Sequence, residues 1–297
     1  MVRFLALIAA TLALAAAGCG GDDGDDSAGE ATETAAASSC ERGDLELVIP
    51  GQLTIATDNP AFPPWFEGGR PQGSIWKLND PATGKGFESA VAYAIAEELG
   101  FKPVEVDWIP VPFTQLFRPG PKDFDFDINQ TSYKPQRAKS VTFSESYYDV
   151  SQALVAPKGN PIARAKSRKE LKRYKLGAQI GTTSYDYIVE NIEPSKKPSV
   201  YDNSNDVISA LKAKQIDGIV VDLPTAFFVT AVEAPGSTIV GQFPAVGEQE
   251  RFGLVFAKGN SLVECVNRAI RTLKDDGTLA EIQQEWLSDK VDAPVLK

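Results

Sequence analysis

The sequence predicts an α/β protein built from two lobes, and two observations carry this prediction. From Cys40 to Lys297 the chain has 258 residues, which is more than one hydrophobic core usually organises and enough for two modest lobes. Short apolar runs also alternate with amphipathic segments along this whole stretch. Such alternation is typical of largely parallel sheets covered by helices, so we expect α/β architecture in both lobes.

Five short apolar runs are expected to form strands, because several of them are followed by Gly, Pro, Asn or Thr. These runs are 53–56, 104–108, 124–128, 176–180 and 218–221. A helix is expected over 86–99, because apolar side chains such as Phe87 and Val91 recur there at helical spacing. Gly100 follows this segment and is a typical residue for ending a helix.

A weak internal repeat relates the segments 124–128 and 216–220, each of which follows a Lys-bearing stretch. The alignment places Gln130 and Asp222 at matching positions just beyond two expected strands. Ligands of open α/β sheets bind beyond the carboxyl ends of the strands, so both residues are candidates for one cleft. Chance similarity between short α/β pieces is nearly as good an explanation.

The N-terminus has the features of an export signal. Arg3 precedes an apolar run over 4–17, which is shorter than the roughly 20 residues that a membrane span needs. The run ends in Ala-Ala-Gly-Cys, which resembles the site at which lipoprotein signals are cut, so residues 1–18 are expected to be a lipoprotein signal peptide and Cys19 the lipidated first residue. The alternative is an ordinary secretory signal followed by an incidental Cys.

Residues 20–39 consist of small or acidic residues, with no side chain large enough to offset the entropy of ordering. The segment 19–50 is therefore expected to be a flexible acidic tether followed by a lead-in to the folded body. A tether of this length reaches roughly 25 Å as a random coil, enough to hold the body clear of a lipid surface. A disordered end without a spacer role is the alternative.

The composition excludes some classes of function. The formal net charge is −10, but from Cys40 onward 34 acidic residues face 29 basic ones. This mild acidity without a basic stripe argues against a nucleic-acid partner. The chain has no His, the commonest general base and zinc ligand, so we expect neither a metal nor another cofactor.

Two cysteines, Cys40 and Cys265, remain if Cys19 is lipidated. In an oxidising compartment outside the cytoplasm they are expected to form a disulfide, although the sequence alone leaves two free thiols as an alternative. The bridge would hold the lead-in before the first strand onto the helices near the C-terminus.

Three motifs together resemble the bacterial extracellular solute-binding proteins for polar amino acids. The first is Leu-Thr-Ile-Ala-Thr-Asp-Asn-Pro-Ala-Phe-Pro-Pro-Trp at 53–65, which looks like the family's first strand and the aromatic loop after it. Gly-Phe-Glu at 86–88 looks like the start of its first long helix, although Ala90 replaces the usual acid. The most specific segment, 129–148, resembles the family's Thr-Pro-x-Arg followed by Phe-Ser-x-Pro-Tyr, with Lys134 for Thr and Ser146 for Pro.

The resemblance implies a binding site for an amino acid. Arg137 matches the family's Arg that pairs with the ligand's α-carboxylate, a geometry that suits a planar guanidinium. Asp222 matches the family's strand-end Asp that binds the α-ammonium. Further ligand contacts are implied for Thr182, Thr183, Gln130, Ser132, Phe62, Phe113 and Trp65.

Simpler interpretations exist for these residues when each is taken alone. An Arg such as Arg137 is ordinarily just solvated, and Thr182 can be explained as a helix N-cap. Asp222 can likewise cap the helix that begins near Pro224, and Phe62 or Phe113 can belong to the core.

The resemblance also implies the architecture and the partners. It implies a type II periplasmic-binding-protein-like fold, with two mixed sheets flanked by helices around a central ligand cleft. The first lobe is expected over 51–150 and 251–297 and the second over 151–250. The protein would act as a monomer, lipid-anchored outside the cell membrane, and would deliver a free amino acid to the transmembrane subunits of an ABC importer.

Two rival functions differ in class from a transport component. Related folds also serve as enzymes, such as dehydratases acting on small carboxylates, and a fold alone cannot exclude this. A tethered sensor subunit is the other rival, but no signalling domain or spanning segment follows the folded body. The sequence favours the binding protein, because Asp222, Arg137 and the two Thr residues make a complete clamp for a zwitterion.

Overall fold

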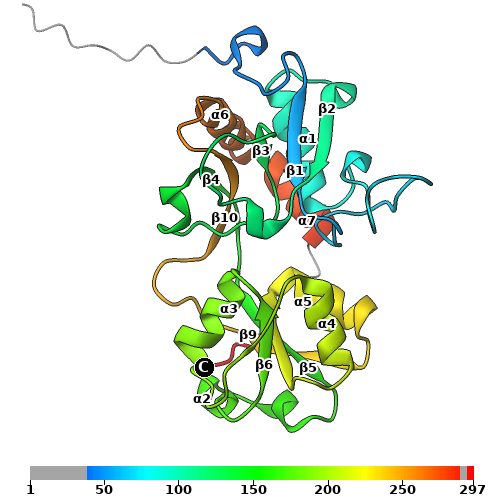
Figure 1. Cartoon of the computed structure of the whole chain (residues 1–297), viewed down its shortest axis with the longest axis vertical. Coiled ribbons are helices and arrows are strands. Elements are labelled where there is room, and N and C mark those ends of the chain that lie inside the picture. The colour runs from blue at the N-terminus through cyan, green and yellow to red at the C-terminus, as the bar shows by residue number, and fades with distance from the viewer. Residues whose placement is uncertain (1–38, 288–292) are drawn as a thin grey trace, which may run out of the picture. The chain divides into compact units, whose positions relative to one another are not determined.

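A computed structural model of the chain describes residues 39–287 and 293–297 (Figure 1). The expected signal peptide 1–18, Cys19 and the tether up to residue 38 lie outside the described residues. No helix in the described part of the chain is both long enough and apolar enough to cross a membrane.

The described residues form two five-stranded mixed sheets, and we refer to the structure built on each as a lobe. The first sheet has the order β2-β1-β3-β10-β4, with β1 parallel to β2 and β3 and β10 antiparallel to β3 and β4. Its strands are β1 (Leu53–Thr57), β2 (Val106–Pro110), β3 (Phe126–Asp127), β4 (Val141–Asp149) and β10 (Arg251–Ala257).

The second sheet repeats this plan with the order β7-β6-β8-β5-β9. Its strands are β5 (Gln152–Pro157), β6 (Leu176–Gln179), β7 (Ser199–Tyr201), β8 (Gly218–Asp222) and β9 (Ser237–Gln242). β6 runs parallel to β7 and β8, while β5 is antiparallel to β8 and β9. The strands β3 and β8, which carry the internal repeat, therefore hold the same third place in the two sheets.

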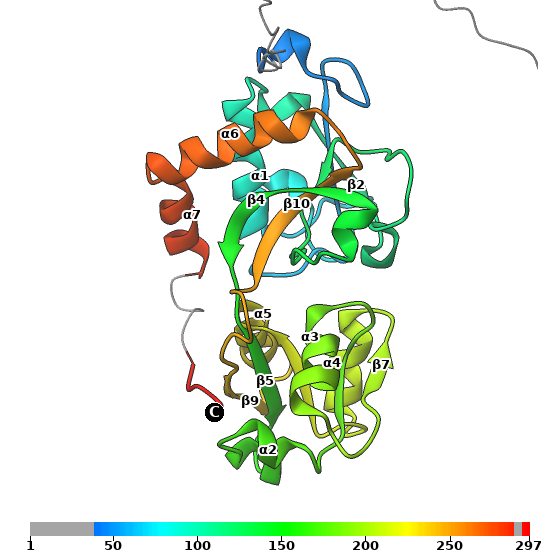
Figure 2. The ribbon, with the colours of Figure 1, turned by 90° about the vertical axis from the view of Figure 1, so that its left-hand side faces the viewer.

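The chain passes between the sheets from β4 to β5 and returns from β9 to β10 (Figure 2). Helices α1 (Phe87–Glu98), α6 (Leu262–Asp275) and α7 (Thr278–Leu287) pack on the first sheet. The second lobe contains α2 (Arg168–Leu171), α3 (Thr183–Tyr187), α4 (Ser204–Lys212) and α5 (Leu223–Phe228). The predicted two-lobed α/β fold is confirmed.

Local chemistry explains why these segments form where they do. All five residues of β1 are buried, as expected for an apolar central strand covered on both faces. Helix α1 begins after Gly86, whose φ is 94° and where a Cβ atom would lie 2.5 Å from the carbonyl oxygen of Trp65. Only glycine fits that position without strain, so Gly86 sets the path of the aromatic loop against α1.

Two expected strands are shorter or shifted in the structure. β2 begins at Val106 because the preceding residues Pro103–Glu105 form a 3-10 turn, in which the Glu105 carboxylate accepts a hydrogen bond from the Lys102 N–H at 2.8 Å. β3 is reduced to two residues because Asp125 turns to accept hydrogen bonds from the N–H groups of Val48 and Thr54.

The end of the chain lies elsewhere than its sequence suggests. Residues 293–297 were expected in the first lobe, but they pack on the second sheet. Val295 bridges to Gln242 of β9, and the buried Leu296 belongs to the core of the second lobe. The sequence pattern of residues 293–297 is neither helical nor typical of a strand. It therefore gives no sign that these residues pair with the edge of β9.

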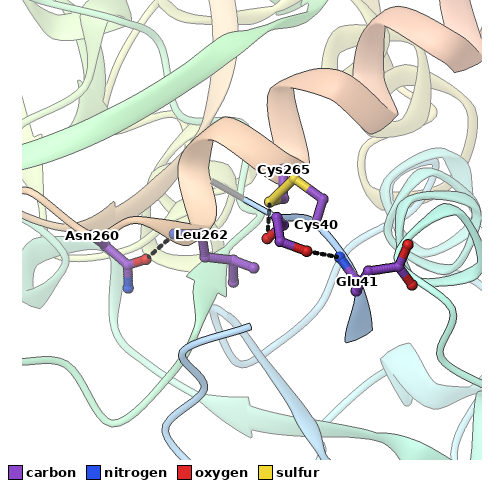
Figure 3. The surroundings of a disulfide bond; sticks show 6 residues. Cys40, Glu41, Asn260, Leu262 and Cys265 are labelled. Carbon is purple, nitrogen blue, oxygen red and sulfur yellow. Dashed lines mark hydrogen bonds between the residues drawn. A yellow bond between two sulfur atoms is a disulfide. The ribbon is translucent and has the colours of Figure 1, made fainter. Parts of the chain in front are cut away.

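The predicted disulfide is present. Cys40 and Cys265 are bonded with their Cα atoms 5.4 Å apart, within the distance that a disulfide can span. Figure 3 shows the bond joining the segment before β1 to the first turn of α6. Arg42 fixes the same segment by a 2.8 Å ion pair with Glu105 and by stacking over Phe101.

Candidate ligand-binding cleft

A cavity of about 290 Å³ is lined by residues from both lobes at the carboxyl ends of the parallel strands. Such strand ends are where open α/β sheets bind ligands, because the loops there are free to carry polar side chains. The structure brings all nine predicted ligand-binding residues to this cavity, which are Arg137, Asp222, Thr182, Thr183, Gln130, Ser132, Phe62, Phe113 and Trp65.

Arg137 is held in place by both lobes. Its guanidinium donates to the carbonyl oxygen of Ser132 at 2.6 Å and, across the cleft, to that of Gly181 at 2.7 Å. It also lies over the rings of Phe113 and Phe117, at 5.4 and 4.6 Å from their centroids. Burial lowers the pKa of Arg137 to about 10, so the side chain is still a cation at neutral pH. It is therefore a placed and desolvated cation, unlike an ordinary solvated Arg.

The two threonines have different roles in the structure. Thr182 is the N-cap of α3, accepting from the N–H of Tyr185 at 3.2 Å and donating to the carbonyl of Gln179 at 2.8 Å. The capping explanation for Thr182 is thus correct. The Thr183 hydroxyl lies 3.4 Å from that of Ser132, which places the hydroxyls of the two lobes beside each other.

Asp222 ends β8 at the cavity wall, and burial together with the nearby Glu250 raises its pKa well above the usual value. Its side chain does not cap α5. Instead, it accepts a 2.6 Å hydrogen bond from the Gln152 amide, which also approaches Glu250 at 3.1 Å. Sequence reasoning missed Gln152 and Glu250, because both lie on the segments that cross between the lobes and neither belongs to a polar motif.

Gln130 adopts a positive φ of 46° directly after β3, an uncommon conformation for a residue other than glycine. Glu88 of α1 stabilises it, because the Glu88 carboxylate accepts hydrogen bonds from both the backbone N–H and the side-chain amide of Gln130. The hydroxyl of Tyr147 donates to the same carboxylate at 2.5 Å. Burial raises the pKa of Glu88 to about 7, although the three donors oppose this rise.

The aromatic residues divide between wall and core. Phe113 lines the cavity while packing edge-on against Phe117, and Phe62 is half-buried in the cavity wall. Trp65 is only 1% exposed and packs against Phe87 and other rings, so it belongs mainly to the core. Its indole N–H nevertheless donates to Thr225 of the second lobe at 3.0 Å, which links the two lobes.

Besides Arg137 and Asp222, the cavity carries more negative than positive side chains. Asp58, directly after β1, and Asp206, at the start of α4, line it together with Lys77. Burial raises the pKa of Asp58. Among the described residues, no group of three or more His, Cys, Asp or Glu side chains is arranged to hold a metal ion.

The chain has known relatives both in sequence and in structure. The sequence is 27% identical over 242 residues to an arginine-binding periplasmic protein of Mannheimia haemolytica, covering 80% of this chain and 92% of the relative. An ancestral arginine-binding protein solved with glutamine bound superimposes with a TM-score of 0.64 at 31% identity, covering 80% of this chain and 98% of that one.

A third similar structure is an ancestral amino acid-binding protein described as a precursor of cyclohexadienyl dehydratase. It has a TM-score of 0.63 and 25% identity, with 80% of this chain and 96% of that chain covered. The sequence model of one family matches residues 53–289, which contain both sheets and the cleft. The chain belongs to the bacterial extracellular solute-binding proteins, family 3.

Proposed function

We propose that the protein captures a free amino acid with a cationic side chain in the cleft and delivers it to the permease of an ABC importer. The observation that carries the proposal is the meeting of Arg137, from the first lobe, with Asp222 and Thr183, from the second, in one cavity. These groups match the carboxylate and ammonium of an amino acid in charge and in hydrogen-bonding type.

The same arrangement supports a mechanism of capture. A ligand whose carboxylate pairs with Arg137 and whose ammonium pairs with Asp222 contacts both lobes at once. Such a ligand stabilises the closed arrangement more than an open one, because the contacts with both sides exist only when the lobes are close. Closure then gives the permease a surface that distinguishes loaded from empty protein.

The charge of the cavity supports a cationic ligand side chain. Arg137 and Asp222 are assigned to the α-carboxylate and α-ammonium of the ligand. The charged side chains left to face the ligand side chain are then two acids, Asp58 and Asp206, and one base, Lys77. The half-buried ring of Phe62 in the cavity wall offers a stacking surface for a planar cation such as guanidinium. The arginine-binding relatives named above point to the same class of ligand.

We further propose that the protein is a monomer, anchored to the outer surface of the cell membrane by lipid on Cys19. The support is the Ala-Ala-Gly-Cys motif and the small, acidic composition of the segment that follows it. Mass spectrometry of protein extracted from membranes tests this, with acylated Cys19 as the expected N-terminus. An intact leader or an unmodified Cys19 in that material would contradict the anchor.

We propose binding without catalysis, although the dehydratase precursor among the similar structures makes an enzyme the rival. A dehydratase needs an acid or base that is free to exchange protons with its substrate. Arg137 and Asp222 in the cleft and Glu250 beside it are each held by hydrogen bonds to neighbouring groups, as a rigid recognition site requires. Incubation with L-arginine and with small hydroxy acids should leave each compound unchanged.

The experiment that tests the function is calorimetry with L-arginine, L-lysine, L-glutamine and L-glutamate. We expect the two cationic amino acids to bind more tightly than the neutral and acidic ones. At 100 times its dissociation constant, the bound ligand should stabilise the protein by about 2.7 kcal/mol. Tighter binding of L-glutamate than of L-arginine would refute the cationic class, and binding of none of the four would refute the proposed function.

A further inference from the structure

The amide nitrogen of Gln152 joins two carboxylates that come from different parts of the chain. It lies 2.6 Å from an oxygen of Asp222 and 3.1 Å from an oxygen of Glu250. The two carboxylate oxygens are therefore at most about 6 Å apart, a distance at which like charges in a partly buried site repel strongly. Gln152 itself is 3% exposed, and both carboxylate residues are partly buried.

The hydrogen bonds around Glu250 leave acceptors rather than donors for a ligand. A carboxylate can only accept, so the Ser132 hydroxyl must donate its single proton to Glu250, at 2.6 Å. Both N–H bonds of Gln152 point to the two carboxylates in the same way, while its carbonyl oxygen accepts from Ser184 at 2.6 Å. Ser132, Asp222 and Glu250 thus together present lone pairs, which suits an ammonium group and opposes a carboxylate.

Glu250 also lies where the two lobes meet. Asp222 lines the cleft cavity and Glu250 lines a second cavity, of about 270 Å³, behind the crossing segments. Thr183 lines both cavities, and the Ser132 hydroxyl that donates to Glu250 lines the cleft cavity, so Glu250 lies directly beside the cleft. Through Ser132 and Gln152, Glu250 connects the first lobe with the start of the second.

We propose that Glu250 is the second carboxylate of the ammonium site and that Asp222 and Glu250 together receive the α-ammonium of the ligand. This inference rests on the proposed function, since it adds a residue beside the cleft to the ammonium site. An ammonium brought near both carboxylates relieves their repulsion, so part of the selectivity for α-amino compounds comes from Glu250. The residue therefore determines specificity for the amino group without touching the side chain of the ligand.

The test compares L-arginine with 5-guanidinopentanoate, which is arginine without its α-amino group, by calorimetry on the wild-type protein and on Glu250→Gln. The substitution keeps an acceptor for Ser132 and Gln152 but removes the charge. We expect the variant to lose on the order of 10- to 100-fold in affinity for L-arginine and less than about threefold for the analogue. An equal loss for both compounds, or no loss for either, would overturn the proposal.

A matched control and a ligand-free measurement separate this proposal from the proposed function. Glu248→Gln removes the same charge from an exposed position two residues away and should leave both affinities unchanged. Without ligand, Glu250→Gln should raise the melting temperature at pH 8 by about 2–4 °C, because it removes the repulsion. A lower melting temperature would overturn the carboxylate pair even if no arginine binds, whereas failure of wild-type binding alone would overturn the cationic ligand.

Discussion

Replacing Glu88 by Gln should change how the stability of the protein depends on pH. Glu88 is fully buried, and its pKa in the folded protein is raised from 4.5 to about 7, chiefly by the cost of burying its charge. Between these two values the folded state holds a proton that the unfolded chain releases. The stabilisation is therefore complete below pH 4.5 and is lost as the pH rises through about 7.

The size of the effect follows from the shift. Each unit of pKa is worth about 1.4 kcal/mol, so the shift of Glu88 corresponds to about 3 kcal/mol between the acidic and alkaline limits. The difference in unfolding free energy between Glu88→Gln and the wild type should therefore change by about 3 kcal/mol in favour of the variant from pH 4 to pH 8. This change is expected whether the variant is more or less stable than the wild type at any single pH. Urea unfolding of both proteins across this range measures the gain. Parallel stability curves would refute the assignment.

Three further predictions concern the disulfide, a buried carboxylate and ligand binding. The double variant Cys40→Ser/Cys265→Ser should lose about 2–5 kcal/mol in unfolding free energy by urea titration, while a reducing agent should not affect it. Asp127 is buried and has no hydrogen-bond partner for either carboxylate oxygen among the described residues, so Asp127→Asn should raise the melting temperature at pH 8, and a fall would contradict the burial penalty. Glu88→Gln should also weaken L-arginine binding by a few-fold in calorimetry, because Gln130 loses an acceptor; unchanged affinity would show that Gln130 needs no support.

The elements that could be predicted from the sequence are those with a local chemical signal. The strand beginning at Leu53 and the helix beginning at Phe87 are marked by apolar periodicity, and both lie within a residue or two of the expected bounds. The position of residues 293–297 has no such signal. Their place beside β9 is decided by tertiary packing, which buries Leu296 in the core of the second lobe.

In the candidate site, too, some residues have a local sequence signal and others are brought in only by the fold. Arg137 and Asp222 could be found because each belongs to a motif at a strand end or beside one, and both line the cavity. Glu88 lies within a recognised motif, but its role depends on the positive φ of Gln130, which becomes visible only in three dimensions. Glu250 belongs to no motif and reaches the site only because the crossing segment brings it beside Gln152.

Calorimetry on Arg137→Ala and Asp222→Ala tests the central claim most directly, because the cleft is proposed to hold opposite ends of one amino acid with these two side chains. Each substitution leaves one ligand charge unpaired, which typically costs 2–5 kcal/mol, or on the order of thirtyfold to several thousandfold in affinity. Arg271→Ala, which removes an exposed cation paired with Glu145, is the control and should bind normally. Near-native affinity for L-arginine in either folded cleft variant would contradict the proposed site.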